Sequence, residues 1–100
     1  MRRRRKGLSI PKVIYLCKLP EEGYRLKRSL AVFLEEGKRG WLASRDDLGI
    51  CCFGETIDDA LTNFAKALLD DYDTYVGKRR LTAGARKLAK RLSEIVEVKD

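Results

Sequence analysis

The chain has 100 residues, 44% of them hydrophobic, and a formal net charge of +7. This length predicts one domain with a single modest core, to which self-association would be a natural supplement. No apolar run approaches the roughly 20 residues of a membrane-spanning helix. The basic stretch 2–6 is not followed by the apolar segment of a signal peptide. We therefore expect a cytoplasmic protein that makes no membrane contact.

The chain lacks several of the residue types and spacings that catalytic sites use. The chain has no histidine, which removes the common general base and the commonest metal ligand. Its three cysteines, Cys17, Cys51 and Cys52, do not have the paired spacings of a disulfide framework or a metal site. We expect them to be small buried hydrophobes. A metal-dependent nuclease would have to use aspartates that no motif connects to a mechanism. The sequence therefore predicts neither an enzyme nor a cofactor.

The first half of the chain predicts strands. Residues 1–9 are expected to be a flexible basic arm, because like charges repel and almost nothing there is apolar. Residues 12–19 are rich in β-branched and aromatic side chains, which is typical of a strand. A Pro-Glu-Glu-Gly turn at 20–23 leads to a second predicted strand, 24–36. The continuous apolar run 30–34 is typical of a strand covered on both faces.

The next segments extend this sheet. A polar turn with two glycines ends at Gly40, and residues 41–44 and 48–53 read as further short strands. Short turns join all the strands, so the simplest topology is an antiparallel meander. Most aromatic residues fall in core-like patterns, and none interleaves with the basic runs as a base-stacking platform would require.

The second half predicts helices. Thr56 is placed to cap a helix with Asp59 three residues later, a variant of the capping box. Apolar residues then keep a helical period of 3.6 up to Val76, and Gly77 is a natural stop. A second helix is expected from Thr82, with one basic face. Residues 93–98 could end this helix or form a strand, and the short pattern leaves both open.

Together these elements predict an α+β fold. A small antiparallel sheet of three to four strands is packed by one long helix, and a basic helix follows at the C-terminus. We divide the chain into the arm 1–9, an α+β domain 10–77 and a basic helical extension 78–100.

Residues 30–76 contain an ordered series of features: a strand ending in acidic residues, a Gly-aromatic strand, a short strand and then Gly-x-Thr, an acidic pair and two Ala-Leu pairs. The motif after the strands consists of Gly54, Thr56, Asp58, Asp59, Ala60, Leu61, Ala67 and Leu68. With these features, residues 30–76 resemble the HicB-like antitoxin family. The resemblance implies a partial RNase H-like or double-stranded-RNA-binding-like fold. It also implies a partner, a small basic HicA-type toxin that attacks mRNA. Residues 78–100 are too short for the complete DNA-binding module that many members carry.

Charge is unevenly distributed along the chain. The balance is +5 over residues 1–6, +4 over 7–45, −7 over 46–77 and +5 over 78–100. The acidic segment would repel nucleic acid and attract a basic protein, or else receive the basic arm of a neighbouring subunit. The predicted partner-facing residues are Asp46, Asp47, Asp58, Asp59, Asp70, Asp71 and Asp73. Asp70, Asp71 and Asp73 could alternatively form a solvated face or pair with the basic residues 78–80.

The basic segments carry the alternative function. The arm could contact phosphates or be only a solubilising tail, and the second helix could follow a nucleic-acid backbone or be an ordinary surface helix. The residues of this candidate site are Arg2, Arg3, Arg4, Arg5, Lys6, Arg79, Arg80, Arg86, Lys87, Lys90 and Arg91. We therefore expect a homodimeric antitoxin-type protein that binds a HicA-type toxin, or a stand-alone nucleic-acid-binding protein.

Overall fold

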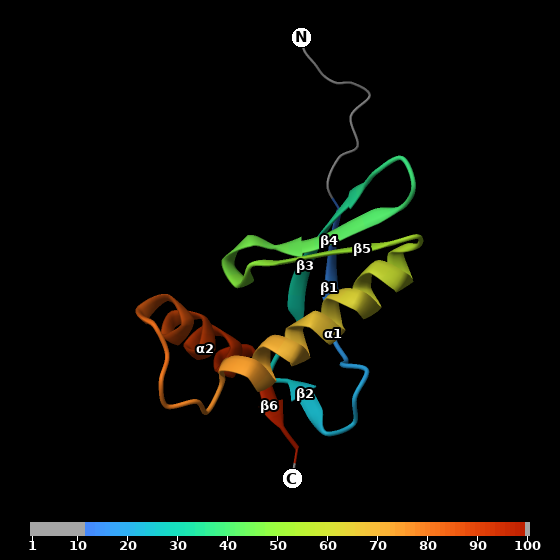
Figure 1. The fold of residues 1–100 in the computed structure, drawn as a ribbon. Helices are drawn as coiled ribbons and strands as arrows, with labels where there is room; N and C mark the ends of the chain where they lie inside the picture. Colours follow the sequence, from blue (N-terminus) through green and yellow to red (C-terminus); the bar gives the residue numbers. More distant parts are fainter. Residues whose placement is uncertain (1–11, 100) are drawn as a thin grey trace.

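A computed structural model describes residues 12–99 of the chain. Its elements, in chain order, are β1 (Lys12–Leu16), β2 (Tyr24–Leu26), β3 (Leu30–Glu36), β4 (Trp41–Arg45), the 3₁₀ turn η1 (Asp46–Leu48), β5 (Ile50–Gly54), α1 (Ile57–Tyr75), α2 (Ala83–Ile95) and β6 (Val96–Val98). The predicted α+β class is confirmed: a four-stranded antiparallel sheet packs against a long helix, and a second helix follows (Figure 1).

The main sheet has the strand order β1-β3-β4-β5. Every neighbouring pair is antiparallel, and Ile14, Val32 and Leu34 lie on the face that α1 covers. The predicted meander is therefore confirmed for these four strands. At the β3–β4 turn the Gly37 amide donates to the Gly40 carbonyl oxygen over 2.7 Å.

The prediction of one continuous strand over 24–36 is wrong. Residues 27–29 interrupt it, and β2 leaves the main sheet to pair with β6 near the C-terminus. The Lys27 amide donates to the Ile95 carbonyl oxygen over 2.7 Å, which fixes the start of this second sheet. The first strand consequently pairs with β3, and β2 lies within the connection between them.

The long helix begins and ends as its sequence predicts. The Thr56 hydroxyl oxygen accepts a hydrogen bond from the Asp59 amide over 3.0 Å. At the other end Gly77 adopts φ +83°, the left-handed conformation that favours glycine after a helix. Asp58 and Asp59 lie in the first turn of the helix, where the positive end of the helix dipole favours negative charge.

Replacing Thr56 by alanine tests this cap. Thr56→Ala leaves an amide of the first turn without its side-chain acceptor, and we expect a loss of about 1 kcal/mol in the free energy of unfolding. The control is Thr62→Ala, since Thr62 lies exposed on the same helix and makes no capping bond. Urea denaturation measures both, and an equal effect of the two substitutions would contradict the capping role.

The core lies between α1 and one face of the sheet. Its largest fully buried side chains are Phe64, Leu34, Leu48, Leu68, Leu92, Val32 and Val96. Burial along β3 alternates, so that Val32 is buried and Phe33 is exposed. The prediction that residues 30–34 are covered on both faces is therefore wrong. The opposite face of β3 is apolar too, which hid the alternation in the sequence.

The C-terminal segment completes the same core. Leu92, Ile95 and Val96 are buried in it, and α2 packs beside α1. The sequence left open whether residues 93–98 end the helix or form a strand, and both occur. The helix α2 continues to Ile95, and Val96–Val98 forms β6. The Thr82 hydroxyl caps α2 by accepting from the Ala85 amide over 3.1 Å, as the sequence predicts.

The prediction that all three cysteines are buried is wrong. Cys17 and Cys51 are exposed, and only Cys52 is partly buried. Cys51 and Cys52 are consecutive residues of β5, so they point to opposite faces of the sheet. Burial is the main cause that raises the pKa of the Cys52 thiol. A thiol reagent would therefore probe the helix-covered face of the sheet through Cys52 and the opposite face through Cys51.

Candidate macromolecule-binding surfaces

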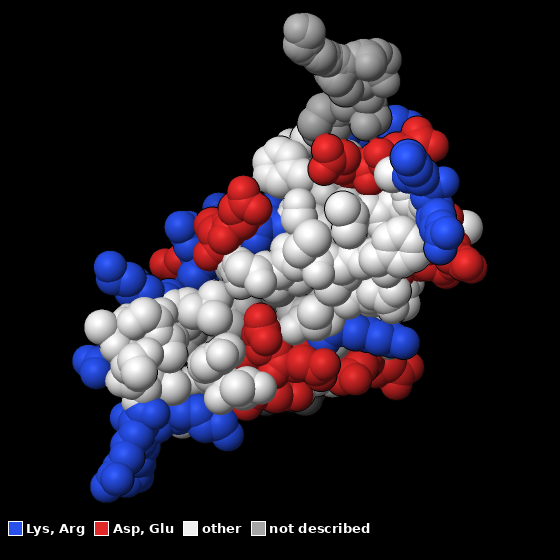
Figure 2. Space-filling view, turned by 45° about the horizontal axis from the view of Figure 1, so that its top comes forward, with Lys and Arg blue, Asp and Glu red and all other residues white. Residues whose placement is uncertain are grey.

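One side of α1 is acidic. Asp59, Lys66, Asp70 and Asp73 are exposed and follow one another at helical spacing, and Lys66 is the only basic residue of the helix. Figure 2 shows acidic side chains gathered along the lower edge of an uncharged central band. The structure thus brings five of the seven predicted acidic residues to one helix. We give the name acidic side of α1 to the line of Asp59, Asp70 and Asp73 together with Asp58 and Asp71, which flank it: Asp58 borders a hollow with Leu16 and Leu19, and Asp71 is half-buried near Cys52.

Neighbouring side chains affect two of these carboxylates, those of Asp73 and Asp71. Tyr24 donates its hydroxyl proton to Asp73 Oδ1 over 2.6 Å, and this bond is the main cause that raises the Tyr24 pKa to about 12. The ring of Tyr24 also meets Tyr72 edge-on, with centroids 5.9 Å apart. Asp73 therefore helps to hold the small sheet against α1. Burial, followed by the neighbouring charge of Asp70, raises the Asp71 pKa. Within residues 12–99, no basic side chain forms an ion pair with Asp70, Asp71 or Asp73.

The remaining predicted acidic residues lie elsewhere. Asp46 and Asp47 belong to η1, beside α2 rather than on α1. Arg45 donates to both carboxylate oxygens of Asp47, from Nε over 2.8 Å and from Nη2 over 2.7 Å. It also donates from Nη1 to the Ala31 carbonyl oxygen over 2.8 Å, and Arg91 Nε lies 3.9 Å from Asp47 Oδ2. Asp47 thus links the end of the sheet to α2.

Replacing Asp47 by asparagine tests that link. The hydrogen bonds from Arg45 are the main cause that lowers the Asp47 pKa. Because the pKa is lowered in the folded state, the stabilisation is complete above the ordinary carboxyl pKa near 3.9 and disappears as pH falls through the lowered value. We expect Asp47→Asn to cost about 1–2 kcal/mol near neutral pH. The cost should shrink on acidification below about pH 4.

Urea midpoints measured across pH check this result. The matched control is Asp46→Asn, which removes a neighbouring carboxylate of the same 3₁₀ turn and should change stability by less than about 0.5 kcal/mol. A cost of Asp47→Asn that stayed constant down to strongly acidic pH would contradict an electrostatic link.

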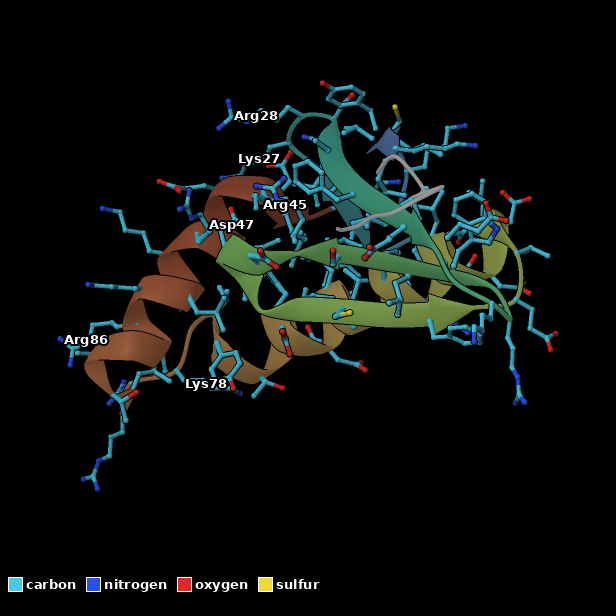
Figure 3. The ribbon with its side chains drawn as sticks, turned by 90° about the horizontal axis from the view of Figure 1, so that it is seen from above. Lys27, Arg28, Arg45, Asp47, Lys78 and Arg86 are labelled. Carbon is cyan, nitrogen blue, oxygen red and sulfur yellow. The ribbon has the colours of Figure 1, made fainter. Side chains whose placement is uncertain are left out.

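The basic residues of the C-terminal segment gather at one end of the molecule. Arg86, Lys87, Lys90 and Arg91 are exposed on α2, and Lys78, Arg79 and Arg80 lead into it. Figure 3 shows Arg86 at the outer part of α2, with Lys27 and Arg28 near the end where Arg45 meets Asp47. We call the exposed basic residues of α2 and of 78–80 the basic end.

The described chain begins after the predicted basic arm. Arg2, Arg3, Arg4, Arg5 and Lys6 lie outside residues 12–99. The first described residue, Lys12, pairs with Leu34 and places its ammonium group 5.0 Å from the centre of the Trp41 ring. Leu16, at the other end of β1, pairs with Leu30, which lies beside Arg91 and Ile95 of α2. The chain therefore enters the sheet at the end remote from the basic end (Figure 1).

Sequence reasoning missed a third surface, the open face of the sheet. Figure 3 looks onto this face and shows α1 behind the strands. Its most exposed side chains include Tyr15, Phe33 and Phe53, with exposures of 63%, 47% and 49%. We call it the open face, and register assigns to it Val13, Tyr15, Ala31, Phe33, Glu35, Leu42, Ser44, Cys51 and Phe53. Most aromatic residues do pack in or against the core, as predicted, but these three of the eight do not.

Two features are absent from residues 12–99. No group of three or more Cys, Asp or Glu side chains lies close enough together to hold a metal ion. Neither α1 nor α2 combines the length and apolarity needed to cross a membrane. Comparison with protein families, with curated proteins and with solved structures found no match for the chain. The HicB-like resemblance therefore stays a prediction based on the motif at residues 54–68.

Proposed function

We propose that this chain is a HicB-like, antitoxin-type binding protein that neutralises a small basic, mRNA-cleaving toxin by protein–protein contact in the cytoplasm. The observation that carries the proposal is the acidic side of α1. Asp58, Asp59, Asp70 and Asp73 are exposed along this helix, Asp71 is half-buried, and Lys66 is the only opposing charge on the helix. Such a surface attracts a basic protein and speeds its association.

The motif residues support this proposal indirectly. Thr56 caps α1, and Gly54 lets the start of the helix lie directly on the sheet. These residues act on the fold, and they present the acidic side of α1 in a fixed position. Asp46 and Asp47 contribute less, because Asp47 is engaged by Arg45 and both residues lie beside α2.

Co-elution with a candidate HicA-type toxin tests the proposal. We expect a complex, with the toxin's RNase activity suppressed at equal molarity. Asp70→Lys should weaken the complex by at least about tenfold, mostly through slower association. Glu22→Lys makes the same charge change in the exposed turn before β2 and should leave the complex unchanged. Full toxin activity at equal molarity, or equal effects of the two variants, would contradict the proposal.

A second candidate function is nucleic-acid binding at the basic end. Arg86, Lys87, Lys90 and Arg91 are exposed on a single helix, and residues 78–80 add three further charges beside them. Contacts of this kind are made to phosphates, tolerate any sequence and weaken as salt rises. The two candidate functions use different surfaces and can be tested separately.

Salt dependence of binding to mixed-sequence duplex DNA tests this second candidate. If Lys87 and Lys90 contact phosphates, replacing both by alanine should make the negative slope of log affinity against log salt less steep by about 2. The double replacement of Lys38 and Arg39 in the β3–β4 turn removes the same charge at a different place and should leave the slope unchanged. Deletion of residues 1–6 measures the contribution of the arm. No binding at low salt would contradict the second candidate.

A further inference from the structure

The open face differs from the rest of the described surface in its lack of charge. Of its nine residues, only Glu35 is ionised, whereas the acidic side of α1 and the basic end hold most of the charge. The exposed large hydrophobic residues of the main sheet, Val13, Tyr15, Phe33, Leu42 and Phe53, all lie on it. A contiguous apolar patch of this kind marks an interaction site.

We propose that the open face binds a second copy of this chain, so that two sheets pack face to face and the helices lie outside. The proposal does not depend on the proposed function, because it uses neither the acidic side of α1 nor the basic end. The partner would lie about 10 Å away, as the sheets of a β-sandwich do.

The area of the face fits a dimer. A large aromatic side chain offers roughly 150–250 Å² for burial, so three half-exposed rings contribute ~300 Å² per copy. With Val13, Leu42 and the small side chains Ala31, Ser44 and Cys51, two facing copies would bury ~1,000 Å², which is about the minimum for a specific interface. We therefore expect a dimer that forms in the micromolar range and dissociates on dilution.

Charge also favours a second copy on this face. Each chain carries a net charge of +7, so two copies repel one another wherever their basic regions meet. The open face is where they can approach with the fewest charges between them. Glu35 lies near the β3–β4 turn, at one end of the face. A two-fold axis within the interface and perpendicular to the strands places the two Glu35 carboxylates at opposite ends.

Any other occupant of the open face would have to fit the same apolar surface and the same low charge. Nucleic acid is disfavoured because the groove beside Phe33 is bordered by the carboxylates of Glu35, Asp46 and Asp47, with Arg45 paired to Asp47. Residues 1–11 precede β1 directly and carry only a few apolar side chains among five basic ones. If residues 1–11 covered the open face in place of a second copy, the experiment below would show it.

The test uses the full chain over a range of concentrations. Sedimentation equilibrium should show a mass approaching twice that of one chain as the concentration rises. Phe33→Lys places a charge at the centre of the face and should raise the dissociation constant by about 100-fold. The control is Val98→Lys, since Val98 is 56% exposed on β6, away from this face, and its replacement should leave the constant unchanged.

A native cysteine provides a second readout that needs no substitution. Alkylation of Cys51, on the open face, should slow as the protein concentration rises. A monomeric mass at all concentrations would overturn the proposal. So would a dimer that Phe33→Lys leaves intact, or protection of Cys51 that is independent of concentration and is lost on deletion of residues 1–11.

Discussion

Phe64→Ala should destabilise the protein by about 3–5 kcal/mol, the largest effect that we expect from any single substitution. Phe64 is fully buried on α1, in the core that joins this helix to the sheet and to α2. Removing its ring leaves a cavity between elements that cannot all move together, because the strands are fixed by their hydrogen bonds. A small domain has only about 5–15 kcal/mol of stability, so the variant should approach unfolding in mild urea.

The matched control for this substitution is Phe53→Ala. Phe53 has the same side chain, but it is about half exposed, on the open face rather than between the layers. Its replacement should cost much less, about 1 kcal/mol or below in the monomer. Urea denaturation followed by circular dichroism gives both free energies. Similar losses for the two variants would mean that α1 does not cover the face of the sheet assigned to it.

Gly54→Ala should cost about 3 kcal/mol or more, although it adds only one methyl group. A Cβ atom at Gly54 would lie 2.6 Å from Ala60 Cα and from the Asp59 carbonyl carbon, and closer still to the Ala60 amide nitrogen. These are backbone atoms of the first turn of α1, so relief requires the helix to move away from β5. Gly54 therefore allows close approach of the helix and does not provide a positive φ, since the only positive φ angles among the described glycines are at Gly49 and Gly77.

The control for this effect is Gly23→Ala. A Cβ atom at Gly23 meets no other atom within 4 Å, and its φ is not positive. We expect a change within about 1 kcal/mol, with a stabilising contribution because alanine restricts the unfolded chain. Thermal unfolding of both variants measures the contrast, and a harmless Gly54→Ala would refute the close contact between α1 and β5.

The elements with local signals were predictable from the sequence. Thr56 and Gly77 bracket α1, and Thr82 starts α2, because caps and stops depend on nearby residues. The short turns likewise predicted the antiparallel order of the main sheet. The side of α1 that holds most of the acidic residues follows from helical spacing alone.

The long-range features were not predictable. The pairing of Tyr24 with Val98 joins segments at opposite ends of the chain, and no local pattern in residues 24–26 marks a departure from the main sheet. Sequence reasoning grouped Asp47 with the acidic residues of α1, because the folding that brings Arg45 and Arg91 to it is non-local. The open face was missed because its side chains are as apolar as those of the covered face.

The central structural claim is that α1 covers one face of the four-stranded sheet and leaves the other face free. The most direct test compares the alkylation rates of Cys51 and Cys52 in dilute protein, where association is absent. These neighbours on β5 differ in the face to which they point, and only Cys52 packs against the core. We predict rapid modification of Cys51 and slow modification of Cys52, which becomes fast only on unfolding. Equal rates for the two thiols in the folded chain would contradict the one-sided sheet, and with it the open face and the position of the acidic side of α1.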